Sequence, residues 1–114
     1  MFKITYFNIH GKAEPIRMLL KHAKIPFIDH RITKEEFSKL KSEGILPAGQ
    51  VPVMTDQDGR IYNQSGAILR SLGLKYGYYP TQWDQAFTCN WAMDTIDDFR
   101  TRDHFRLNFQ PQVS

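Results

Sequence analysis

Apolar and polar residues alternate over positions 2–6, a period of two that predicts a strand with one buried face. From Glu14 onward the apolar residues recur every three or four positions, and Pro15 stands where a first helical turn accepts proline. These features predict an amphipathic helix that ends before Pro26. Residues 27–32 predict a second strand. Because two strands joined by a helix normally lie parallel in one sheet, the chain opens with a β-α-β unit.

Further elements complete one α/β domain. Thr33 is placed to cap a short helix, with Glu36 three residues later as its capping-box partner. Residues 51–54 and 60–62 predict two short strands joined by an Asp-Gln-Asp-Gly hairpin turn. A third helix follows, and Ser65 is its expected N-cap. The predicted order of elements is therefore β-α-β-α-β-β-α.

The pattern changes after this domain. Residues 76–80 contain Gly77 and Pro80, which predict a linker that ends the third helix. Residues 83–100 carry apolar side chains roughly along one stripe and predict a further helix. Residues 101–114 show little pattern, and we expect a poorly ordered tail there.

Composition and charge narrow the class of protein. The 114 residues carry a net charge of +3, with 15 Lys and Arg dispersed among 12 Asp and Glu, so no basic stripe predicts nucleic acid as a partner. Cys89 is the single cysteine, which excludes an intrachain disulfide framework and suits a reducing compartment. No long apolar run indicates a signal peptide or a membrane span, and we expect a cytoplasmic protein without a membrane partner.

The Val51-Pro52 pair is the first candidate for chemistry, because proline at the start of a strand has no N–H for the ladder. One interpretation is an edge strand with an ordinary trans proline. The other is a cis bond that turns the backbone of Val51 outward, where an extended peptide would pair with its N–H and C=O like an added strand.

The start of the third helix is the second candidate. The hydroxyl of Ser65, next to Gln64, and the first N–H groups of the helix are aimed at one place, where a carboxylate would be favoured. The alternative is that Ser65 is only a helix cap.

Tyr6 is the third candidate, because it ends the first strand, where open sheets with parallel strands place their ligands. One interpretation is a core aromatic whose hydroxyl reaches the surface. The other is a hydrogen-bond donor to a bound thiolate, which would lower the pKa of the thiol and enrich the nucleophile.

Three segments at these places resemble the cytosolic glutathione transferases, and most of all the sigma class that includes the haematopoietic prostaglandin D synthases. The segments are Tyr6-Phe7-Asn8 with Gly11-Lys12-Ala13-Glu14, Leu46-Pro47-Ala48-Gly49-Gln50-Val51-Pro52-Val53, and Asn63-Gln64-Ser65-Gly66-Ala67-Ile68-Leu69-Arg70. They occur in the family's order, and the resemblance covers about residues 2–100. It implies a thioredoxin-like glutathione-binding domain over residues 1–76, a linker at 77–81, and the start of an all-α domain over 82–114, one helix plus an irregular tail.

The resemblance also implies roles for individual residues. Tyr6 would activate the sulfur of glutathione, which is the implied co-substrate. Gln50 and the Val51 backbone would hold the cysteinyl part, and Gln64 and Ser65 would bind the γ-glutamyl carboxylate. The full implied binding set is Phe7, Lys12, Phe37, Lys41, Gln50, Val51, Pro52, Gln64 and Ser65, with Asp98 contributed by a partner subunit.

This sequence departs from the family's pattern at two places in the site. Lys12 stands where the family usually has arginine, so a point charge replaces a planar fork and Glu14 lacks its most usual partner. Phe37 and Lys41 resemble a tryptophan and a lysine near the glycyl end, but phenylalanine lacks the indole donor.

Three aspartates in the helix after the linker resemble the stretch that faces the partner subunit in the prostaglandin synthases. By that resemblance Asp94, Asp97 and Asp98 would join the partner's aspartates in holding a divalent metal. The alternative is an exposed acidic helical face, since carboxylates from one chain make a weak site for a hard cation.

Two functions of different classes follow. The first is a glutathione transferase that conjugates glutathione to small hydrophobic electrophiles, as a homodimer or packed against another subunit. The second is a non-catalytic scaffold or subunit of a larger assembly. The family's second domain has several helices and this sequence carries roughly one, so we expect most of the electrophile pocket to be missing.

Overall fold

The computed structural model describes the backbone of residues 1–109 and the side chains of residues 1–99. The chain divides into two compact units, Met1–Tyr78 and Tyr79–Ser114. In chain order the elements of the first unit are β1 (Phe2–Phe7), the 3₁₀ turn η1 (Gly11–Ala13), α1 (Glu14–His22), β2 (Phe27–Ile32), α2 (Lys34–Ser42), the 3₁₀ turn η2 (Pro47–Gly49), β3 (Val53–Thr55), β4 (Ile61–Tyr62) and α3 (Ser65–Tyr76). This order confirms the predicted α/β arrangement.

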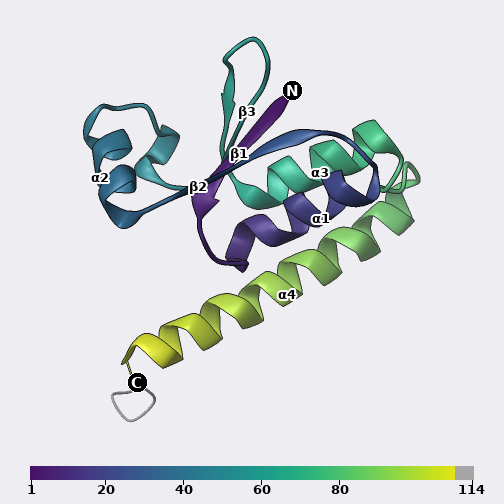
Figure 1. Ribbon diagram of the computed structural model, residues 1–114. Helices are drawn as coiled ribbons and strands as arrows, with labels where there is room; N and C mark the ends of the chain where they lie inside the picture. The colour runs from purple at the N-terminus through teal and green to yellow at the C-terminus, as the bar shows by residue number, and fades with distance from the viewer. Residues whose placement is uncertain (110–114) are drawn as a thin grey trace. The chain divides into compact units, whose positions relative to one another are not determined.

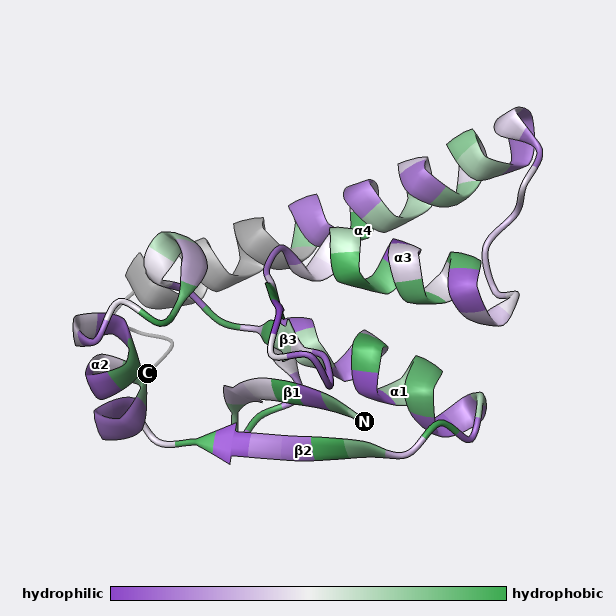
Figure 2. Ribbon diagram, turned by 90° about the horizontal axis from the view of Figure 1, so that it is seen from above, coloured by the Kyte–Doolittle hydropathy of each residue, from purple (hydrophilic) through white to green (hydrophobic). Residues whose placement is uncertain are grey.

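The strands form one mixed sheet in the order β2-β1-β3-β4. β1 pairs with β2 in parallel, as the β-α-β unit predicts, while β3 pairs antiparallel with both β1 and β4. α1 and α3 lie side by side on one face of this sheet, and α2 lies beyond the arrow of β2 (Figures 1 and 2). The carboxyl end of β1 therefore lies between α2 and the start of α1 (Figure 1).

The core lies between the sheet and the two neighbouring helices. Its largest apolar side chains that are at most 2% exposed are Ile4, Ile16, Leu20, Ile68 and Leu72. Ile16 and Leu20 come from the predicted three-to-four spacing of α1, and Ile68 and Leu72 repeat it in α3. Burial of these two helix faces fixes the position of α1 and α3 over β1.

β1 differs from the prediction in one respect, because it is buried on both faces over its central residues. Thr5 is only 3% exposed, although alternation assigns it to the open face. Its hydroxyl lies 3.1 Å from Nδ1 of His30 on β2, and its other neighbour in the register is Val53 on β3. An interior strand has neighbours on both sides, so even its polar positions are covered.

The capping prediction for α2 is confirmed. The hydroxyl of Thr33 accepts a hydrogen bond of 3.1 Å from the N–H of Glu36, and the Glu36 carboxylate accepts one of 2.9 Å from the N–H of Thr33. Both donors would otherwise be left without partners at the helix start, so this capping box fixes where α2 begins.

The second unit contains α4 (Trp83–Phe109). The helix extends past Arg100, so the predicted irregular tail is wrong over residues 101–109, and residues 110–114 lie outside the described part of the chain. No glycine or proline interrupts the sequence between Pro80 and Pro111, which explains why the helix continues. Of the helices described, none is both long and apolar enough to cross a membrane.

Candidate functional site

The segments singled out in the sequence meet in one small pocket of the first unit. Its volume is about 50 Å³, comparable to one or two water molecules, which suits one end of a ligand. The residues that line it are Lys12, Ala48, Gln50, Val51, Pro52, Asn63, Gln64 and Ser65. They come from η1, from η2 and the segment before β3, and from the start of α3, three parts of the chain that only folding brings together.

The Val51–Pro52 bond is cis, so the alternative of an ordinary trans proline is wrong. Val51 precedes β3, whose register with β1 begins at the pair Thr5 and Val53. Val51 therefore lies outside that ladder, and it is one of the residues that line the small pocket. A backbone segment in this place is able to pair with an extended peptide.

The start of α3 forms the opposite wall of the small pocket. Gln64 is the N-cap residue, with φ at +70°, and its side chain makes no capping hydrogen bond. The prediction that Ser65 caps α3 is therefore wrong, because the helix begins at Ser65 itself. The Ser65 hydroxyl and the amino end of α3 adjoin the pocket together with the cationic Lys12. This combination of groups favours a bound carboxylate.

Tyr6 adjoins the small pocket through Lys12. The Tyr6 side chain is 8% exposed, and its hydroxyl oxygen accepts a hydrogen bond of 3.3 Å from the backbone N–H of Lys12. Gly11 allows this contact, since its φ is +45° and a Cβ there would lie 2.5 Å from the Tyr6 hydroxyl. A phenol that accepts a hydrogen bond through its oxygen still has its own O–H to donate.

The residues implied for the glycyl end form a second group on α2 and β1. The rings of Phe7 and Phe37 meet edge to face with centroids 5.3 Å apart, and Nζ of Lys41 lies 5.9 Å from the centroid of Phe37. The stem of Lys41 passes close to Gly49, where a Cβ would lie 3.1 Å from its Cε. Gly49 precedes Gln50, so the Lys41 side chain approaches the segment that lines the small pocket.

Arg17 is the residue of this region that the sequence prediction missed. It lies on α1 with no exposed surface, and its guanidinium group makes four hydrogen bonds. The acceptors are Asp29 at 3.1 Å, Glu14 at 3.2 Å, and the carbonyl oxygens of Ile9 at 2.8 Å and Phe7 at 3.3 Å. The sequence predicted that Glu14 would lack its most usual partner, because Lys12 stands where the family usually has arginine. In the structure Glu14 forms its ion pair with Arg17 instead.

A signal for Arg17 was present in the sequence. Ala13, Ile16 and Leu20 are all buried and recur at three- and four-residue spacing, and Arg17 falls on the same helical stripe. A charged side chain inside an apolar stripe must be paired when it is buried, since an unpaired buried charge is very costly.

The three aspartates Asp94, Asp97 and Asp98 lie on α4 in the second unit. Among the side chains that the structure describes, no three His, Cys, Asp or Glu residues gather into a group that could hold a metal ion. Among the described side chains, Asp94, Asp97 and Asp98 therefore form no metal site by themselves, and the predicted site also called on the aspartates of a partner subunit.

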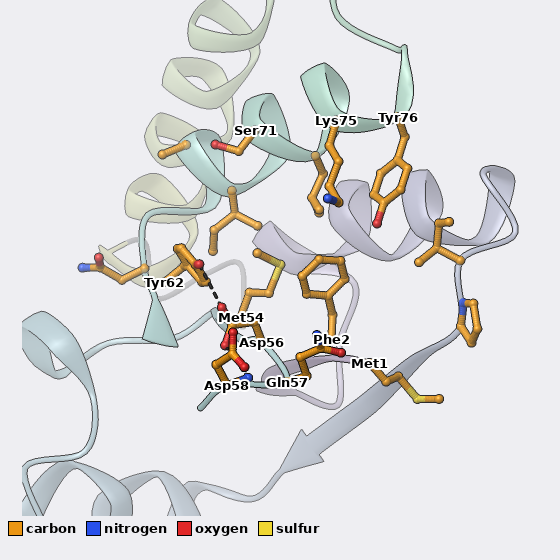
Figure 3. A pocket seen from close by; sticks show the side chains of 16 residues that line it. Met1, Phe2, Met54, Asp56, Gln57, Asp58, Tyr62, Ser71, Lys75 and Tyr76 are labelled. Atoms are coloured by element: carbon orange, nitrogen blue, oxygen red, sulfur yellow. Dashed lines mark hydrogen bonds between the residues drawn. The ribbon is translucent and has the colours of Figure 1, made fainter. Parts of the chain in front are cut away.

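A larger cavity of about 720 Å³ lies elsewhere in the first unit, between the hairpin and α3 (Figure 3). Phe2, Met54 and Leu72 give it apolar walls, and Lys75 and Asp56 lie at its edge, where the Tyr62 hydroxyl donates a hydrogen bond of 3.0 Å to Asp56. The side chains that line it include none of those implied for glutathione. The small pocket, although much smaller, is lined by Lys12, Val51 and Ser65, which belong to the set predicted from the sequence.

The sheet order and the flanking helices are those of a thioredoxin-like fold. The family model for the glutathione S-transferase N-terminal domain matches residues 12–74, and the chain belongs to the glutathione S-transferase family.

Two relatives and one solved structure illustrate this similarity. Glutathione S-transferase 2 of Onchocerca volvulus is 52% identical over 75 residues, which cover 66% of this chain and 35% of the relative. Hematopoietic prostaglandin D synthase of Gallus gallus is 40% identical over 99 residues, or 86% of this chain and 48% of the relative. The structure of prostaglandin synthase D of Nilaparvata lugens superposes with a TM-score of 0.87 at 36% identity, covering 99% of this chain and 55% of that one. The chain thus spans about half or less of the length of these relatives.

Proposed function

We propose that this chain binds glutathione and uses Tyr6 to stabilise the glutathione thiolate for conjugation to small hydrophobic electrophiles. The observation that carries the proposal is the small pocket, where Lys12, Val51 and Ser65 converge from three separate segments. Family membership supports glutathione as the ligand that such a pocket holds.

Each end of glutathione has a matching group in this proposal. The γ-glutamyl carboxylate binds at the amino end of α3, to Gln64 and the Ser65 hydroxyl, with Lys12 adding a positive charge. The cysteinyl part pairs with the backbone of Val51 beside Pro52 and Gln50. The glycyl end lies toward Phe37 and Lys41, with Phe7 packed behind Phe37.

The chemistry follows from the hydroxyl of Tyr6. Its oxygen accepts from the N–H of Lys12, and its O–H donates to the glutathione sulfur, which favours the thiolate over the thiol. The thiol proton passes to solvent. The thiolate then attacks an electrophilic carbon of the substrate, the new C–S bond forms, and the leaving group departs with its electron pair.

The organisation of the protein completes the proposal. Residues 1–76 form the glutathione-binding domain, 77–81 the linker, and 82–114 the start of an all-α domain. We propose a cytoplasmic homodimer, or a subunit packed against another chain, in which Asp98 of α4 reaches glutathione bound by the partner.

Calorimetric titration of glutathione into the purified chain tests the binding step. We expect a single binding site and a heat that disappears when the γ-glutamyl carboxylate is replaced by an amide, because the carboxylate is the group matched to Ser65 and Lys12. A chain that gives no heat with glutathione would contradict the proposal.

A second function, that of a non-catalytic scaffold, is favoured by the apolar surface of α4. Trp83, Phe87 and Trp91 recur every four residues and are 83%, 64% and 61% exposed. Contiguous exposed apolar surface is typical of a contact with another protein. Light scattering combined with an apolar-surface dye separates the two functions: a monomer that binds glutathione and no dye would argue against the scaffold.

A further inference from the structure

Arg17 is a charged side chain that is fully buried. Arginine is almost never fully enclosed unless paired, and Arg17 is 0% exposed. Its two partner carboxylates, Glu14 and Asp29, keep 27% and 29% of their side-chain surface exposed. The enclosed charge is therefore paired with two carboxylates that both reach solvent.

The two remaining hydrogen bonds of Arg17 hold the backbone between β1 and η1. Its Nη1 donates to the carbonyl of Ile9 at 2.8 Å, and its Nη2 donates to the carbonyl of Phe7 at 3.3 Å. These carbonyls lie just after Tyr6 and just before Gly11. The same group is bonded to Glu14 at the first position of α1. Arg17 thus fixes both ends of the segment 7–14.

Further hydrogen bonds connect Arg17 to the same segment through β2. Asp29, on β2, accepts from Arg17 through Oδ1 and from Arg31 through Oδ2 at 2.9 Å. Arg31 in turn donates to the side-chain oxygen of Asn8 at 2.9 Å. The segment after β1 is therefore held by hydrogen bonds from α1 and from β2.

The segment 7–14 contains the two residues that contact the Tyr6 hydroxyl. It carries the N–H of Lys12, which donates to the Tyr6 oxygen, and Gly11, which packs directly against that oxygen. The guanidinium carbon of Arg17 also lies 5.8 Å from the centroid of the Tyr6 ring. Arg17 therefore contacts the ring of Tyr6 and, through the backbone, the partner of its hydroxyl.

We propose that Arg17 is a positioning residue for the Tyr6 hydroxyl: it holds the segment 7–12 so that Lys12 N–H occupies the acceptor side of the oxygen and the O–H proton points to the bound sulfur. This inference rests on the proposed role of Tyr6. Arg17 itself does not touch the thiol. Lysine in its place keeps the charge but loses the planar fork that reaches two carboxylates and two carbonyls at once.

The test is a double-mutant cycle over R17K and Y6F, with R60K as the matched control on the exposed hairpin. Thermal unfolding and glutathione calorimetry first establish that each variant is folded and binds. The central measurement is the ultraviolet absorbance of the glutathione thiolate in each saturated complex as a function of pH. Conjugation rates with an activated aryl halide give a second, independent measurement.

We expect R17K to move the thiolate titration toward higher pH and to lower kcat about 10-fold with little change in KM, the scale of effect of a small misplacement of a reacting group. In the Y6F background R17K should have little further effect, because the hydroxyl it positions is gone. Equal effects of R17K in both backgrounds would overturn the inference, since a purely structural role does not depend on Tyr6.

The outcomes also separate this inference from the proposed function. If Y6F titrates like the unmodified chain, Tyr6 does not stabilise the thiolate and the proposed function is wrong. If Y6F shifts the titration while R17K does not, only the positioning role of Arg17 is wrong. If R17K does not fold, D29N replaces it, because this variant weakens one of the two carboxylate partners that orient the guanidinium group. It should shift the thiolate titration in the same direction by a smaller amount, and an equal shift in the Y6F background would overturn the inference.

Discussion

The backbone N–H of Lys12 donates a hydrogen bond of 3.3 Å to the hydroxyl oxygen of Tyr6. This one contact joins the end of β1 to the small pocket, because Lys12 also lines that pocket with Gln64 and Ser65. It leaves the tyrosine O–H as the donor toward a ligand. The candidate nucleophile site and the candidate carboxylate site are thus connected through a single residue.

Replacement of Tyr6 by phenylalanine removes the donor and keeps the ring in the core. We expect glutathione affinity to change little and the conjugation rate to fall about 10- to 100-fold, the effect of losing one hydrogen bond to a charged group. Steady-state kinetics with an activated aryl halide provide the measurement. Tyr62→Phe is the control, because it removes a tyrosine hydroxyl whose partner is Asp56, in the larger cavity. Equal losses in both variants would mean that Tyr6 has no special role.

Replacement of Gly11 by alanine places a methyl group 2.5 Å from the Tyr6 hydroxyl. We expect a loss of about 2–3 kcal/mol in the free energy of unfolding, from overpacking added to the strain of a positive φ, together with a loss of conjugation. Chemical denaturation measures the first effect and kinetics the second. Gly44→Ala is matched in backbone, with φ at +71° and no atom within 4 Å of the added Cβ, and should cost about 1 kcal/mol with activity retained. If both variants lose the same stability, the contact with Tyr6 does not constrain the site.

Replacement of Ser65 by alanine tests the carboxylate site. Ser65 is the first residue of α3 and the N-cap position is held by Gln64, so the variant does not alter the N-cap residue and should keep its unfolding midpoint. Its affinity for glutathione should fall about 10-fold, because one hydrogen bond to a carboxylate is lost. Calorimetry measures the affinity, and Ser71→Ala, farther along the same helix, should change neither quantity. A lower midpoint with unchanged affinity would assign Ser65 a structural role instead.

The capping box of α2 makes the stability of this helix depend on pH. The backbone N–H of Thr33, followed by its hydroxyl, lowers the pKa of Glu36 below its usual value. A group whose pKa is lowered by folding contributes stability above its unfolded pKa and loses that contribution as pH falls through the folded pKa. We therefore expect the unfolding midpoints of the unmodified chain and Glu36→Gln to differ near neutral pH and to converge below about pH 4.

Glu35→Gln is the control for this pH dependence, since Glu35 occupies the same first turn of α2 but is not part of the capping box. It should leave the pH profile of the midpoint close to that of the unmodified chain. A constant difference between the Glu36→Gln variant and the unmodified chain across the whole pH range would show that the carboxylate charge does not contribute. Because α2 carries Phe37 and Lys41, the same series should be repeated with glutathione present.

Much of the fold could be predicted because its signals are local. β2 has the bounds Phe27–Ile32 that the sequence predicts, and the Thr33 and Glu36 pair marks the start of α2 without any distant contact. The candidate segments around Tyr6, Val51 and Ser65 could also be recognised in the sequence. Proline is unusual in a strand, and serine near a helix start tends to bond the backbone groups there.

Other features could not be predicted because they depend on residues far apart in the chain. The buried Arg17 needs Asp29 on β2 to be tolerated, and Thr5 is covered because β1 has strands on both sides. The cap of α3 was mispredicted because a positive φ at Gln64 puts Ser65 inside the helix. The sequence by itself determined the order of the elements and the types of group at the site, since each depends on a few neighbouring residues. Only the tertiary structure decided that Lys12, Val51 and Ser65 share one pocket and that an enclosed arginine holds the segment beside Tyr6, because both follow from packing α1 and α3 against the sheet.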